Sequence, residues 1–150
     1  MGKSNTLLVF ALDEQRYALF LDAVERVIRV VEVTPLPKAP EMVLGAINMQ
    51  GRIIPVMNLR KRFRLPEQEF NLNNHLIIAR TPKRDVAIVA DNVAGVYNYP
   101  DENLIEKGRI LPEMEYVEGV VKLDDGMILI HNLNKFLSLD EEVLLDKAIG

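Results

Sequence analysis

Short apolar runs separated by polar turn residues fill most of the chain. The run at residues 6–12, TLLVFAL, is followed by the polar DEQ and then by RYALFL, which is the pattern of a β-hairpin. In the next segment, DAVERVIRVVEV, helical spacing gives way to β-branched residues, so we expect a short helical turn that leads into a strand. Three prolines in TPLPKAP then require an extended connection.

A second strand–turn–strand pattern, GAINMQGRIIPVMNL, has its tight turn at Gly51. The charged segment RKRFRLP after it predicts a short helix that ends before Pro66. The C-terminal segment predicts a longer helix over residues 138–149, because Ser138 and Glu141 have the spacing of a capping box. We expect this helix to pack on the rest of the fold through an apolar face made of Leu144, Leu145 and Ala148.

The pattern of strands occurs twice. Asp91 follows Asp22 by 69 positions, and Gly119 follows Gly45 by 74 positions. Other residues of the same type recur at these two offsets, which indicates an internal duplication with a longer middle loop in the second copy.

The two copies span roughly residues 7–65 and 76–139 of a single domain, 1–150, and each contains about five short strands. The expected fold class is therefore mainly β. Strand units of this size suit small closed barrels, which leave no exposed sheet edge. A barrel made from half of the chain encloses few apolar side chains. Two barrels packed together would bury more apolar surface by sharing one core.

Composition narrows the function classes. The 150 residues carry 18 basic and 22 acidic side chains, a net charge of −4, which disfavours nucleic acid as a partner. Cysteine is absent, so disulfides, thiolate zinc sites and a cysteine nucleophile are excluded, and a reducing cytoplasm is the expected location. No apolar run approaches the ~20 residues of a membrane helix, so we expect no direct membrane insertion.

Candidate catalytic chemistry is sparse. Neither His75 nor His131 has a second metal ligand at short spacing, and we expect His131 to be a hydrogen-bonded structural residue. The duplicated Asp22 and Asp91 favour a capping role for the backbone at a strand end. There is no phosphate-binding glycine loop and no serine elbow. We therefore expect no enzyme activity, no metal and no cofactor.

One local excess of positive charge occurs, and it predicts a solvated helix face or a contact with an acidic protein surface rather than a nucleic-acid site. It consists of Arg52, Arg60, Lys61, Arg62 and Arg64. Two barrels that meet at an angle would also leave a groove, and an apolar groove of this kind can bind a helix. The side chains expected to line it are Val24, Val27, Ile28, Val30, Val93 and Val96. The residues therefore favour a protein–protein adaptor as the function.

Four segments in order resemble the CheW-type chemotaxis coupling proteins over nearly the whole chain, from Leu7 to Leu139. GAINMQGRIIPVMNLRKRF is similar to the family's G-x-I-N-L-R-G-x-I-x-P-V-I-D-L-R segment. TPLPKAPEMVLG resembles its lead-in, VAIVADNVAGVYNY its second-copy segment and YVEGVVKLDDGMILIHNLNKFL its closing segment. The resemblance implies two intertwined five-stranded SH3-like barrels with a shared core.

The resemblance also implies a non-catalytic adaptor that links the helical cytoplasmic tips of chemoreceptors to the regulatory domain of a CheA-type histidine kinase. It implies recruitment from the cytoplasm to membrane receptor arrays, and we expect the isolated chain to be monomeric. The groove residues above, with Gln50, would contact the receptor. Residues of the hallmark segment would contact the kinase, namely Asn48, Met49, Gly51, Arg52 and Arg60.

Three positions depart from the family pattern. Gln50 stands where the family usually has arginine, and Asn58 and Asn132 stand where it usually has aspartate. A neutral amide at position 50 replaces a charged fork of donors, which puts the strength or specificity of the receptor contact in doubt. Arg52 could restore the charge if it shares a face with Gln50.

Three alternatives stay open beside the chemotaxis adaptor. One is a same-fold adaptor for a different kinase pathway, such as surface motility. The others, less favoured, are an OB-like nucleic-acid-binding module and a small enzyme on a double barrel.

Overall fold

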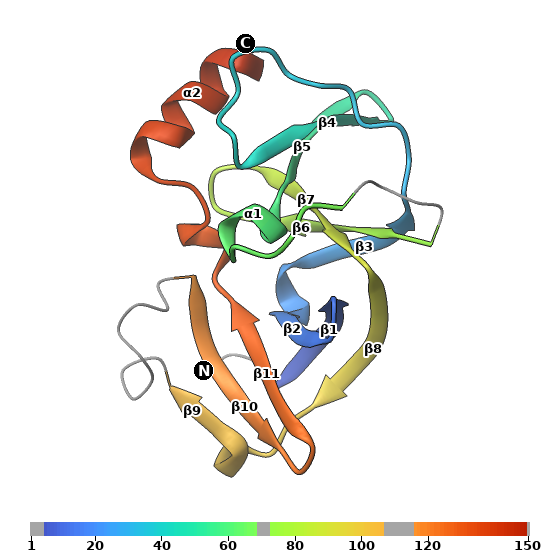
Figure 1. Ribbon diagram of the computed structural model, residues 1–150, viewed down its shortest axis with the longest axis vertical. Helices are drawn as coiled ribbons and strands as arrows, with labels where there is room; N and C mark the ends of the chain where they lie inside the picture. Colours follow the sequence, from blue (N-terminus) through green and yellow to red (C-terminus); the bar gives the residue numbers. More distant parts are fainter. Residues whose placement is uncertain (1–4, 69–72, 107–115, 150) are drawn as a thin grey trace.

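The computed structural model describes residues 5–68, 73–106 and 116–149, and it consists of two β-sheets with short helices at their margins (Figure 1). One sheet has the order β8-β1-β2-β11-β10-β9 and the other the order β3-β6-β7-β5-β4. The strands are β1 (Thr6–Leu12), β2 (Gln15–Phe20), β3 (Val24–Arg29), β4 (Val43–Met49), β5 (Arg52–Met57), β6 (His75–Arg80), β7 (Asp85–Ala90), β8 (Asn92–Asn98), β9 (Leu104–Glu106), β10 (Val117–Leu123) and β11 (Gly126–His131). The helices are η1 (Leu21–Ala23), α1 (Leu59–Arg62), η2 (Asp101–Asn103), η4 (Leu133–Lys135) and α2 (Leu139–Ile149).

The two sequence repeats exchange strands. The first sheet combines β1 and β2 of the first repeat with β8 to β11 of the second, and the other sheet combines β3 to β5 with β6 and β7. Two parallel pairings join the repeats within the sheets, β11 with β2 and β5 with β7. Each barrel therefore contains strands of both repeats, so neither repeat forms a barrel from its own residues.

The equivalence of the repeats extends to individual elements. The hairpins β4–β5 and β10–β11 are displaced by 74 positions at both ends, and α1 and η4 begin at the same displacement. Asn58 and Asn132 cap these two short helices, because their Oδ1 atoms accept from the backbone N–H groups of Lys61 and Asn134, each at 3.1 Å. Asparagine and aspartate cap helices about equally well, so the neutral residues preserve this local structure.

β3 and β8 are the strands at which the chain crosses from one barrel to the other. The segment after each of them pairs with β4 or β10, at the far side of the sheet, and so closes the barrel. In one barrel, β9 pairs with β10 in the register Ile105 to Val120. In the other, a single bridge joins Thr34 to Ala46, at the equivalent place. The expected five strands are present in one sheet, whereas the other has six because Pro100 and η2 separate β8 from β9.

Alternate side chains of the strands serve different cores. Leu7 and Val9 of β1 pack in a cluster confined to their own barrel, whereas Leu8 and Phe10 pack in a cluster shared by both sheets. A third cluster, around Leu76 and Ile78 of β6, fills the other barrel. Burial on both faces explains why the strands read as continuous apolar runs instead of alternating patterns.

The C-terminal helix α2 begins at the predicted capping box. The N–H of Ser138 donates to the Glu141 carboxylate (2.8 Å), and the N–H of Glu141 donates to the Ser138 hydroxyl (3.1 Å), which confirms the capping prediction. Leu145 is fully buried in the shared core, but Leu144 is 45% exposed, so the predicted apolar face was wrong at that position. Consecutive residues of a helix are about 100° apart around its axis, so when Leu145 faces the core Leu144 lies at the side of the helix, partly in solvent.

His131 ends β11 inside an aromatic cluster. Its ring centroid lies 5.4 Å from that of Phe63 and 5.6 Å from that of Phe136, and only 3% of the residue is exposed. Neither ring nitrogen has a hydrogen-bond partner among the described residues, so the expectation of a hydrogen-bonded histidine was wrong. Burial, and then the charge of Arg62, lower the pKa of His131 to about 3. The first repeat has Met57 at the equivalent position.

We expect His131→Met to remove part of the pH dependence of stability. A histidine in the unfolded chain takes up a proton below its ordinary pKa of 6.5, whereas buried His131 stays neutral to about pH 3. Protonation therefore favours the unfolded chain between these values. The wild-type protein should lose roughly 1.4 kcal/mol more unfolding free energy per pH unit than the variant.

Urea unfolding of both proteins at about pH 7, 5.5 and 4.5 measures this difference. Carboxylates titrate alike in the two proteins and cancel in the comparison. Parallel curves of stability against pH would contradict the burial of a neutral imidazole.

Candidate functional site

The crossing strands β3 and β8 form the face between the barrels (Figure 1). They are equivalent in the two repeats, and each pairs with a strand of the other repeat, β3 with β6 and β8 with β1. Val24 and Val93 pack against the shared core. Val27 and Val96, the next equivalent pair, are 37% and 58% exposed. The cross-strand neighbours of this outer pair belong to the shared core, so both valines lie on the inter-barrel face.

Two other predicted groove residues lie on a different face. Ile28 pairs with Leu76, and both Ile28 and Val30 pack against the core inside a single barrel. The structure therefore brings Val24, Val27, Val93 and Val96 to equivalent places on the inter-barrel face, but it does not place Ile28 and Val30 with them.

The hallmark segment forms the β4–β5 hairpin turn. Gln50 and Gly51 both have positive φ, 55° and 87°, as a two-residue turn matched to strand twist requires. The Asn48 side chain accepts a hydrogen bond from the Gly51 N–H (2.9 Å). Met49 packs against the barrel interior, while Gln50 is exposed at the tip. Asn48, Gln50 and Gly51 are thus exposed to solvent, whereas Met49 supports the turn from within.

Arg52 begins β5 and is held by two carboxylates. Its guanidinium lies 2.7 Å from Glu25 of β3 and 2.6 Å from Asp85 of β7. The hydrogen bond from Arg52 lowers the pKa of Glu25. Arg52 is nevertheless 46% exposed at the side chain, so it links the hairpin to the crossing strand while one face of the guanidinium remains open to solvent.

Two exposed apolar residues beside the hairpin turns were missed in the sequence. Ile53 on β5 is 51% exposed and Met127 on β11 is 49% exposed. They are separated by 74 positions and are therefore equivalent in the two repeats. The fixed offset was the signal that could have identified them, since each barrel presents the same kind of side chain at the same place.

Arg60, expected at the kinase contact, is only 8% exposed. Its guanidinium binds Asp13 of the β1–β2 turn (3.0 Å), Asp91 between β7 and β8 (2.6 Å) and the carbonyl of Pro66 (3.0 Å). Burial disfavours the charge, but hydrogen bonds to the two aspartates hold the pKa of Arg60 above its usual value. The structure therefore makes Arg60 an internal tie between the repeats rather than a surface contact.

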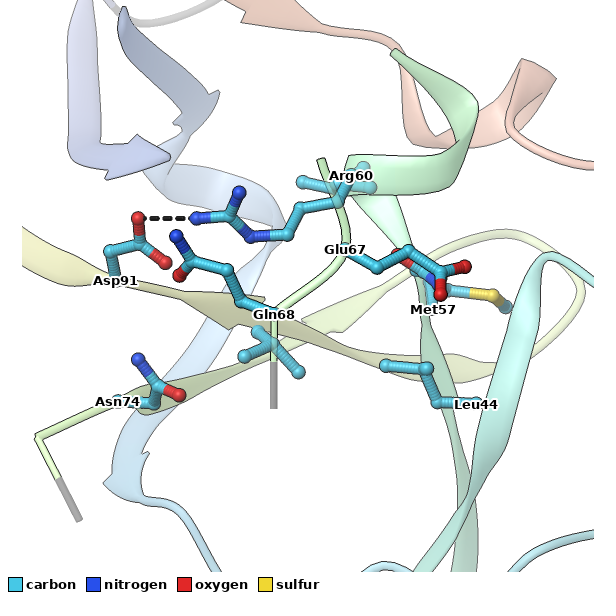
Figure 2. A pocket seen from close by; sticks show the side chains of 10 residues that line it. Leu44, Met57, Arg60, Glu67, Gln68, Asn74 and Asp91 are labelled. Atoms are coloured by element: carbon cyan, nitrogen blue, oxygen red, sulfur yellow. Dashed lines mark hydrogen bonds and ion pairs between the residues drawn. The ribbon is translucent and has the colours of Figure 1, made fainter. Parts of the chain in front are cut away.

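Figure 2 shows the pocket around this tie. The Arg60 guanidinium points toward Asp91, with Gln68 and Asn74 nearby, and Leu44 and Met57 line another side. Asp91 also accepts from the Asp13 N–H (2.7 Å). Asp91 therefore does hydrogen-bond a backbone group, but that group belongs to a turn 78 residues away rather than to the turn that follows Asp91, and Asp22 shows no such bond within the described residues.

The remaining cations of the basic cluster are also mostly paired. Lys61 lies 3.3 Å from Glu41, and Arg62 lies 2.6 Å from Glu141 while its guanidinium covers the Tyr116 ring at 4.7 Å. Counter-charges of this kind leave little positive potential for a phosphate backbone. The described residues contain no group of three or more metal-binding side chains, and none of their helices is long and apolar enough to cross a membrane.

We expect Arg60→Ala to lower the unfolding free energy by about 3 kcal/mol, because removal of one partner leaves the carboxylates of Asp13 and Asp91 without their counter-ion. Lys61→Ala, one residue later, is the matched control. Its pair with the 80%-exposed Glu41 is a surface interaction worth about 0.5 kcal/mol or less. Urea unfolding measures both, and equal losses would contradict the structural role of Arg60.

The chain matches the family model of the CheW-like domain over residues 6–141. Chemotaxis protein CheW of Thermotoga maritima is 32% identical over 148 residues, which cover 98% of this chain and 95% of that protein. Protein FrzA of Myxococcus xanthus is 25% identical over 131 residues, covering 83% and 79%.

The crystal structure of the scaffolding protein TtCheW from Thermoanaerobacter tengcongensis has the same fold. Its TM-score is 0.82 at 30% identity, and the match covers 94% of this chain and 96% of that one. The mainly β fold predicted from the sequence is confirmed. The family match runs through both repeats, and the chain therefore belongs to the CheW family of chemotaxis coupling proteins.

Proposed function

We propose that this protein is a non-catalytic cytoplasmic adaptor that joins the helical tips of chemoreceptors to the regulatory domain of a CheA-type histidine kinase in membrane-associated arrays. The observation that carries the proposal is the exposed valine pair on the inter-barrel face, Val27 and Val96. Apolar side chains half exposed beside a buried core suit the apolar stripe of a docked helix. Val24 and Val93 form the floor beneath them.

The kinase contact is assigned to the turns of the β4–β5 and β10–β11 hairpins. Asn48 and Gly51 are exposed at the first of these turns and Ile53 adds apolar area beside it, whereas the exposed Gln50 is assigned to the receptor contact. Met127 gives the other barrel an equivalent apolar position. Two similar but non-identical surfaces on one chain allow it to bridge two partners at once, as an array component must.

A second candidate is an adaptor of the same fold for a different kinase pathway. The exposed Gln50 favours it, because the family usually presents an arginine at this tip and a neutral amide selects a different counter-group. Nucleic-acid binding is not proposed, since four cations of the basic cluster are held by carboxylates.

Calorimetric titration with a receptor-tip helical fragment and with a kinase regulatory domain from the same cell tests the two contacts separately. We expect Val27→Asp and Val96→Asp each to weaken receptor binding about tenfold or more and to leave kinase binding unchanged, because a charge is buried in an apolar contact. Ile53→Asp should weaken kinase binding and spare the receptor.

Val143→Asp is the control for these variants. Val143 is 52% exposed, within the range of the three tested positions, and lies on α2, which contributes no residue to either assigned surface. Loss of both activities in every variant, including the control, would indicate unfolding. Unchanged receptor binding in both valine variants would refute the receptor assignment.

We expect Gln50→Arg to raise receptor affinity about two- to fivefold if the receptor tip carries the acidic group that the family's arginine meets, which is the gain of an exposed ion pair. The exposed tip imposes no packing constraint on the longer side chain. Titration of the variant with the same receptor fragment measures the gain. An unchanged or lower affinity would favour the different-pathway candidate.

A further inference from the structure

The pocket around Arg60 has an equivalent in the other repeat. Asn58, Leu59 and Asp91 line the first pocket. Asn132, Leu133 and Asp22 line a second pocket, and they are their equivalents at the offsets of 74 and 69. The duplication has therefore produced two copies of one cavity. The residues that differ between the copies indicate how their functions differ.

The second pocket lacks both partners that Asp91 has in the first. Position 134, equivalent to Arg60, is asparagine, and position 82, equivalent to Asp13, is proline. Asn134 carries no charge, and Pro82 has no N–H to donate. Within the described residues the Asp22 carboxylate has no hydrogen bond or ion pair, although the Asp91 carboxylate has two partners there. The second cavity is also larger, about 250 Å³ against about 120 Å³.

His131 supplies a second group without a partner. It lines the same pocket, is 97% buried, and has no hydrogen-bond partner at either ring nitrogen among the described residues. A neutral imidazole has one acceptor nitrogen, so the pocket combines a carboxylate and an unused buried acceptor. Met57 at the equivalent place in the first pocket offers no such acceptor.

Two further charged residues line the second pocket. Glu118 is half-buried and already has an interaction of its own. Arg80 is 66% exposed, and its guanidinium is directed to Glu25, with Nε 3.8 Å from that carboxylate. The pocket thus offers the Asp22 carboxylate to an incoming positive group, while the Arg80 guanidinium interacts with Glu25.

We propose that this second pocket receives an arginine side chain from a protein partner, with Asp22 as its carboxylate. Arg60 in the first pocket is the template, because it shows that a guanidinium fits a cavity of this construction. Arginine suits the site better than lysine, since its planar fork of donors can meet the Asp22 carboxylate and a second acceptor together. The inference rests on the proposed function only in assuming a protein partner, and its test needs none.

Titration of the ¹⁵N-labelled protein with Nα-acetyl-arginine amide tests the site directly. We expect saturable shifts of the amide signals of Ala23, Asn132 and Asn134, with a dissociation constant on the order of 10 mM. Asp22→Asn should abolish them, whereas Asp124→Asn, at an exposed turn outside the pocket, should not. Nα-acetyl-lysine amide should bind about threefold or more weakly. Linear shifts without saturation, or shifts equal in Asp22→Asn, would overturn the proposal.

A variant that places an arginine of the chain itself in the pocket provides an independent test. Asn134→Arg restores the residue found at position 60, and the melting temperature should rise by about 2–4 °C as the new guanidinium pairs with Asp22. The same substitution in an Asp22→Asn background should give no rise, and Asn134→Arg should also remove the shifts caused by the arginine probe. An equal effect on melting temperature in both backgrounds would refute the pairing.

Discussion

Sharing of one apolar core between two barrels is the constraint on which the rest of the structure depends. Each barrel alone would enclose only a small cluster, such as the one around Ile130 or the one around Ile78. The larger cluster lies between the sheets and takes side chains from both. β3 and β8 carry the chain from one sheet to the other, so the two halves of the shared core are held together by covalent continuity.

The same exchange creates the candidate binding face. β3 and β8 must cross between the barrels, and they carry Val24 and Val93 into the core while Val27 and Val96 remain at the surface. The candidate face is thus a consequence of how the two halves are joined. Rigid strands position it better than loops would, which suits a protein whose role is to hold partners in fixed relation.

The two repeats differ at positions that are structurally important in one of them. Arg60 neutralises two aspartates and ties the repeats together, while the other copy keeps the aspartate without the arginine. Met57 fills one copy of a core position and His131 the other, which introduces a buried titratable group. One duplicated framework can therefore offer two unlike surfaces, because the residues at the rims differ from those that form the shared core.

Local and periodic features could be predicted from the sequence alone. The hairpins, the Ser138 cap and the repeat offsets depend on neighbouring residues and on turn chemistry, and each is present in the structure. Strand exchange, the burial of Arg60 and the inward position of Ile28 depend on contacts between residues far apart in the chain, which periodicity does not encode. An apolar run cannot tell which of two buried faces a side chain occupies, and only the tertiary structure decided that.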